Sequence, residues 1–69
     1  MTFNQLKEYH LKQISVVLKS GKEVRGIITS HKWNTEGDKI IAISVLTESY
    51  IERIECTTIQ EIKILDSEG

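Results

Sequence analysis

The spacing of the hydrophobic residues changes once along this chain. Near its start, side chains that can share one face recur every three or four residues, and this spacing is typical of a short amphipathic helix. We therefore predict a helix over about residues 3–12. Thr2 and Gln5 have the spacing of a capping box at its first turn. The stripe on its apolar face is formed by Phe3, Leu6 and His10.

From Ile14 onward, apolar and polar residues alternate, which predicts strands because successive side chains of a strand point to opposite faces. Short polar stretches interrupt the alternation and predict turns, with Gly21 free to take a positive φ angle. The one longer loop that we expect covers residues 32–38. The predicted strands cover about residues 13–19, 22–31, 39–47, 50–56 and 59–65, with a turn or one 3₁₀ turn at Thr57 and Thr58.

A helix followed by five short strands predicts an all-β fold, in which the strands form one strongly bent, SH3-like small barrel. We expect a single domain over residues 1–69, with the helix at about 3–12, the barrel at about 13–65 and a frayed tail at 66–69. The predicted core consists of Ile14, Val16, Leu18, Val24, Ile28, Ile41, Ile43, Val45, Ile54, Ile62 and Ile64.

Composition supports strands over helices. The chain has eleven isoleucines, four valines and six threonines, and such β-branched side chains pack well in sheets. A single cysteine, Cys56, excludes a disulfide framework and fits a cytoplasmic protein. No apolar run is long enough for a transmembrane span. Charge is uneven, because residues 1–33 carry six basic and two acidic side chains whereas residues 34–69 carry three and eight.

Two segments resemble the motifs of Sm-like proteins. Residues 16–28, VVLKSGKEVRGII, resemble the first Sm motif, in which a hydrophobic-x-Leu-Lys-Asp/Asn-Gly turn is followed by a second glycine. Gly21 would close the first hairpin, and Gly26 would let the second strand bend. Residues 54–64 have the length and hydrophobic spacing of the second motif. With the leading helix, the resemblance covers nearly the whole chain and implies an Sm-like barrel.

The residues with which Sm-like proteins bind uridine-rich RNA are not kept. In that family an Asp-x-x-x-Asn stretch and an Arg-Gly pair form the base pocket. Residues 30–34 read SHKWN, so Asn34 matches the asparagine but no aspartate precedes it. Glu55 and Cys56 replace the Arg-Gly pair, and a carboxylate there repels phosphate. The Leu-Lys-x-Gly hairpin and the closing strand also resemble the bacterial Rho-binding antiterminator, an Sm-shaped regulator that contacts a protein.

Basic and aromatic residues gather in the first half of the chain. Such clusters stack on bases and contact phosphates, so they form a candidate nucleic-acid site. The alternative that we favour is that Trp33 caps an open end of the barrel while the lysines form a solvated face. The candidate residues are Lys19, Lys22, Arg25, His31, Lys32, Trp33 and Asn34.

We find no catalytic constellation and expect no enzymatic activity and no cofactor. His10, His31 and Cys56 meet no spacing of metal ligands, so no metal site is expected. Cys56 is more simply explained as a strand thiol than as a nucleophile, which would need a base and an orienting group.

The last two predicted strands contain no proline and few lysines, so their edges are poorly defended against pairing. In Sm-like proteins these strands join neighbouring subunits into rings. The favoured function is a small regulator that contacts a protein of the transcription or RNA-handling machinery. The alternatives are RNA or DNA binding by the basic-aromatic end, and a self-assembling subunit. The candidate edge residues are Tyr50, Glu52, Arg53, Glu55, Glu61 and Lys63.

Overall fold

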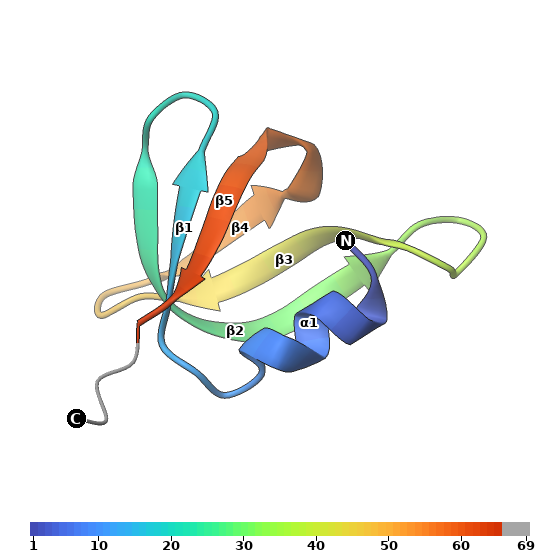
Figure 1. The fold of residues 1–69 in the computed structure, drawn as a ribbon, viewed down its shortest axis with the longest axis horizontal. Coiled ribbons are helices and arrows are strands. Elements are labelled where there is room, and N and C mark those ends of the chain that lie inside the picture. The colour runs from blue at the N-terminus through green and yellow to red at the C-terminus, as the bar shows by residue number, and fades with distance from the viewer. Residues whose placement is uncertain (66–69) are drawn as a thin grey trace.

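The computed structural model describes residues 1–65, which form one short helix and five antiparallel strands in a single sheet (Figure 1). The fold is thus mostly β with a leading helix, as predicted. The tail expected at residues 66–69 lies outside the described residues. The elements are α1 (Phe3–Tyr9), β1 (Ile14–Leu18), β2 (Glu23–Trp33), β3 (Ile40–Leu46), β4 (Ile51–Glu55), the 3₁₀ turn η1 (Cys56–Thr58) and β5 (Ile59–Ile64).

The strands lie in the order β4-β3-β2-β1-β5, so β4 and β5 are the two edges of the sheet. β2 pairs with β1 up to Gly26 and with β3 from Ile27 onward. The sheet is therefore bent into two three-stranded parts that share β2, and α1 lies beside β2 and β3 (Figure 1). Within residues 1–65 no ladder joins β4 to β5, so the sheet is not closed.

The helix begins at the predicted cap but ends earlier than expected. The Gln5 N–H donates to the Thr2 hydroxyl at 3.2 Å, and the Thr2 N–H donates to the Gln5 side chain at 2.9 Å. The helix ends at Tyr9 because a tight turn follows, in which the Lys12 N–H donates to the Tyr9 carbonyl oxygen at 3.2 Å. Leu11 occupies the third position of this type II turn with a φ of 60°.

β2 extends into the segment that was predicted to be a loop. Lys32 pairs with Ala42 and Trp33 pairs with Ile40, so the register shifts by one residue between these two pairs. The skipped residue is Ile41, whose side chain is 37% exposed, whereas Ile40 is buried. The predicted core position of Ile41 is therefore wrong, because a β-bulge changes the face to which this part of β3 points.

The core lies between the two parts of the bent sheet. The predicted core position of Ile64 is wrong, because Ile64 lies on the edge strand β5 and is 43% exposed. From the helical stripe only Leu6 is buried, while Phe3 and His10 are exposed. The core consists of Leu6, Ile14, Val16, Val24, Ile28, Ile40, Ile43, Val45 and Ile54, with Leu18 and Ile62 partly buried against it.

Gly26 lies where β2 bends and changes its pairing partner. A Cβ atom added there would be 2.1 Å from the Leu46 carbonyl oxygen and 2.9 Å from Val45 Cγ1, so no side chain fits. Gly21 has a different role, because it closes the β1–β2 turn with a φ of 96° in open space. Both roles agree with the prediction from the sequence.

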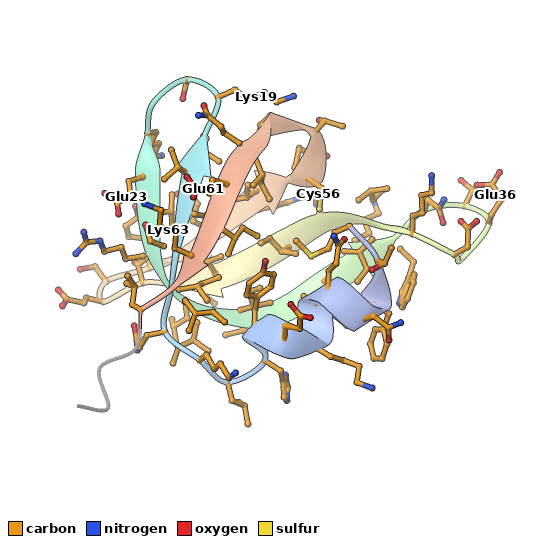
Figure 2. All side chains as sticks on the ribbon, viewed as in Figure 1. Lys19, Glu23, Glu36, Cys56, Glu61 and Lys63 are labelled. Carbon is orange, nitrogen blue, oxygen red and sulfur yellow. The ribbon has the colours of Figure 1, made fainter. Side chains whose placement is uncertain are left out.

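Charged side chains lie across the outer face of β5, β1 and β2. Ser15 is buried between its cross-strand neighbours Lys63 and Arg25, and its hydroxyl donates a hydrogen bond to Glu23 Oε2. Arg25 Nε donates to the same oxygen at 2.9 Å. The Ser15 hydroxyl and, next, the Arg25 guanidinium lower the pKa of Glu23 from its ordinary value of 4.5. Glu23 and Lys63 are labelled on this face in Figure 2.

Replacing Gly26 by alanine is expected to destabilise the fold by more than about 3 kcal/mol, because the methyl group overlaps a backbone oxygen. Gly21→Ala is the matched variant, since its methyl group meets open space and its cost, about 1–2 kcal/mol, comes from the left-handed backbone. Urea-induced unfolding measures both free energies. Equal losses in the two variants would contradict the role assigned to Gly26.

The lowered pKa of Glu23 predicts a pH dependence of stability. The stabilisation from its contacts is complete above a pH of about 4.5 and is lost as the pH falls through the lower pKa of the folded state. The free energy of unfolding of Glu23→Gln should therefore change less between about pH 6 and about pH 3 than that of the wild type. Glu36→Gln, a change in an exposed loop, is the control (Figure 2). The same pH dependence in Glu23→Gln and the wild type would refute this role.

Candidate binding surfaces

The bend at Gly26 divides the predicted nucleic-acid residues into two groups. One group, on the β1–β2 hairpin, lies near the tip that Lys19 marks in Figure 2. The other group, residues 31–34, lies at the far end of β2, remote from this hairpin. The structure therefore does not bring the seven residues together in one patch. The hairpin group consists of Lys19, Lys22 and Arg25.

Two of the three hairpin cations face carboxylates. Lys22 Nζ lies 3.3 Å from Glu52 Oε2 of β4, and Arg25 Nε lies 2.9 Å from Glu23 Oε2. Arg25 and Glu23 are exposed, and Lys22 is exposed while Glu52 is half-buried, so these pairs contribute little to the stability of the fold. They nevertheless reduce the positive potential that the hairpin offers to a phosphate, which makes it a weak candidate for nucleic-acid binding.

His31 and Trp33 of β2 lie against Phe3 of α1 and form an aromatic cluster. The ring centroids of Phe3 and Trp33 are 5.9 Å apart with an interplanar angle of 27°, and those of His31 and Trp33 are 5.7 Å apart with the rings nearly perpendicular, at 78°. Lys7 Nζ lies 5.9 Å from the centroid of the Phe3 ring, within the range of a cation–π contact. The sequence pattern predicts His31 and Trp33 as site residues but misses Phe3 and Lys7. The i, i+4 spacing of Phe3 and Lys7, which places both on one helical face, is the signal that could have indicated them.

A hollow of about 470 Å³ lies beside the aromatic cluster, between α1 and β2. We call it the α1–β2 hollow. Leu6 and Ile28 are the buried apolar residues that it reaches, and half-exposed Phe3 adds an aromatic face. Its ionisable lining residues are all basic. The lining consists of Phe3, Leu6, Lys7, His10, Ile28, Thr29, Ser30 and His31.

The amide of Asn34 is used within its own loop. Its Oδ1 accepts hydrogen bonds from the Asp38 N–H at 3.0 Å and the Lys39 N–H at 3.3 Å. Its Nδ2 donates to Asp38 Oδ1 at 2.8 Å. Asn34 therefore shapes the turn between β2 and β3, which leaves little of its amide to hydrogen-bond a base. Lys32 is exposed and, as the neighbour of both His31 and Trp33 in a strand, belongs to the opposite face of β2.

The edge strand β4 presents unpaired backbone groups on one side. The Thr47 N–H donates to the Tyr50 carbonyl oxygen at 2.8 Å, so this pair is hydrogen-bonded. Hydrogen-bonded and non-bonded pairs alternate in an antiparallel ladder. Ser44 and Arg53, three pairs further along, are therefore a non-bonded pair, and the Arg53 N–H points away from β3. The same alternation points the Ile51 and Glu55 N–H groups to this free edge.

Apolar side chains lie next to this edge. Ile51 is 61% exposed and pairs with Leu46, which is 45% exposed. Tyr50 is 52% exposed and, with Leu46, lines an open hollow of about 810 Å³ between the β2 bend and the β3–β4 turn. Arg53 and Glu55 lie on the same face of β4 as Ile51, with their charged groups 3.4 Å apart. The edge therefore combines backbone donors, apolar surface and both signs of charge.

Glu61 and Lys63, the other two predicted edge residues, belong to the opposite edge of the sheet. Glu61 pairs with Val17 and Lys63 pairs with Ser15, so both lie on β5 next to β1. The six predicted edge residues therefore form two separate edges within one chain rather than a single surface.

Cys56 lies in η1 and is half-buried, and burial raises the pKa of its thiol. A thiol that stays protonated at neutral pH is a poor nucleophile. In residues 1–65 no three His, Cys, Asp or Glu side chains lie close enough together to hold a metal ion. The same part of the chain contains no helix that is long and apolar enough to cross a membrane.

Comparisons with protein-family models, with curated proteins and with solved structures found no match to this chain. Its function must therefore be inferred from the chemistry of the surfaces described above.

Proposed function

We propose that this chain is a non-enzymatic binding module of the Sm-like type, and that it acts as a small regulator by contacting a protein of the transcription or RNA-handling machinery. The observation that carries the proposal is the open edge of β4, which offers backbone donors and acceptors beside exposed apolar side chains. Exposed edges of this kind receive an extended segment of a partner as an additional strand.

The order of the elements supports the Sm-like part of the proposal. A short helix precedes five strands, and β4 and β5 are at opposite edges, as expected if one edge is to meet a strand from another chain. The second glycine of the first motif, Gly26, lies at the bend that such a fold requires. The motifs that imply this fold and the geometry of the sheet thus agree at the same residue.

Two features favour a protein over RNA as the partner. Glu55, where Sm-like proteins place arginine, is an exposed carboxylate whose nearest cation is Arg53 at 3.4 Å. Asn34, which matches the asparagine of the RNA pocket, has its amide bonded to Asp38 and Lys39. A phosphate near Glu55 would have to compete with this carboxylate for the Arg53 cation, and a base near Asn34 would find little of the amide free to hydrogen-bond.

The proposal is tested with the substitution Arg53→Pro. Proline removes the N–H that points to the free edge, and the β3 ladder does not use this N–H, so the fold is expected to persist. Arg53→Ala is the matched control, because it removes the same guanidinium and keeps the N–H. Affinity capture from nuclease-treated host extract should recover one protein partner with the wild type and with Arg53→Ala, and at least about tenfold less with Arg53→Pro.

Circular dichroism and light scattering accompany the capture. A native spectrum for Arg53→Pro shows that lost binding is not lost folding. Loss of the captured partner after nuclease treatment would contradict the proposal and favour nucleic-acid binding. A wild-type mass of several chains that Arg53→Pro reduces to one chain would also contradict it, because the edge would then be occupied by a second copy.

A further inference from the structure

We propose that the α1–β2 hollow is a second docking site, which receives an apolar side chain flanked by carboxylates from a partner protein. This site is separate from the β4 edge, because no residue of β4 lines the hollow. The proposal therefore goes beyond the edge contact and does not depend on it.

The first argument is the apolar surface that the hollow leaves open. Phe3 is 45% exposed, whereas Leu6 on the same helix is buried. One face of the Phe3 ring lies on Trp33, and the residue also lines the hollow with Leu6 and Ile28. An aliphatic or aromatic side chain placed there would bury this surface, and burial of apolar area is the main source of binding free energy.

The second argument is the charge around the hollow. Lys7, His10 and His31 are its ionisable lining residues, and no acidic residue lines it. Glu8, the acidic residue of α1, is absent from the lining. Carboxylates beside the inserted side chain would meet Lys7 at the rim, whereas an ammonium group there would be repelled. Charge complementarity therefore selects an acidic segment.

The third argument is the strained residue Leu11, which follows the lining residue His10. Leu11 has a φ of 60° and is 75% exposed, at a turn position where glycine or asparagine is favoured. A leucine in this conformation is strained, because its Cβ lies close to the following carbonyl oxygen, and it gains little burial in the free chain. Leu11 directly follows His10, which lines the hollow, and its exposed side chain is free to contact a partner segment that extends past the hollow. Strain of this kind is common at functional sites.

Trp33, the single tryptophan of the chain, stacks on Phe3 and reports on the hollow by its fluorescence. The probes are three blocked hexapeptides: acetyl-EELLEE-amide, acetyl-KKLLKK-amide and acetyl-EEGGEE-amide. We expect a saturable change of the Trp33 signal with the first peptide at submillimolar concentration, and at least about tenfold weaker binding of the other two. Similar affinity for the acidic and the basic leucine peptide, or no binding of the acidic one up to several millimolar, would overturn the proposal.

Variants locate the binding. Lys7→Glu should weaken the acidic leucine peptide about tenfold, while Lys19→Glu, the same charge change on the β1–β2 hairpin, should leave its affinity unchanged. Leu11→Asn should weaken it about fivefold without lowering the thermal midpoint, since asparagine tolerates the left-handed turn position. Equal effects of Lys7→Glu and Lys19→Glu would contradict the assignment to the hollow.

Two further measurements distinguish this proposal from the β4 edge contact and from nucleic-acid binding. Arg53→Pro should bind the acidic leucine peptide with the affinity of the wild type. The two proposals can therefore fail independently: a negative capture experiment does not affect the peptide result, and a negative peptide titration does not affect the edge contact. A single-stranded oligouridylate is titrated under the same conditions. Quenching of Trp33 by the oligonucleotide but not by the peptide would overturn the proposal and assign the aromatic cluster to base stacking.

Discussion

The close approach of Gly26 to the backbone of Leu46 is the constraint from which the remaining architecture follows. There is no room for a side chain between them. Because Gly26 has none, β2 can bend at this residue and pair with β1 before it and with β3 after it. The two parts of the sheet then enclose the apolar core, and β4 and β5 are left at opposite edges. The same bend carries the hairpin lysines away from the aromatic cluster.

The two proposed contacts differ in their physical basis. At the β4 edge, recognition would come from backbone hydrogen bonds, which accept many sequences and gain selectivity from the side chains on either side. At the α1–β2 hollow, recognition would come from shape and charge, with Phe3 and Lys7 selecting an apolar and an acidic group. A partner that used both would be held by a nonspecific and a specific element at once, and each would add to the affinity of the other.

The sequence predicts the order and type of the elements because their signals are local. Capping at Thr2 and the positive φ of Gly21 depend on residues within a few positions, and both are found in the structure. The positions of Ile41 and Ile64 depend on a bulge and on which strand becomes an edge, and neither can be read from alternation alone. For the same reason the aromatic cluster is only half predicted, since Phe3 reaches Trp33 across thirty positions of sequence.

β2 is the one strand, within residues 1–65, that belongs to both parts of the sheet. Neither part can therefore melt by itself without removing hydrogen bonds from a strand that the other part needs. Folding of the hairpin side and of the aromatic side should be coupled into a single cooperative transition, with β2 the last segment to lose amide protection and the edge strands the first. Tightening one side by ligand binding would then slow the opening of the other.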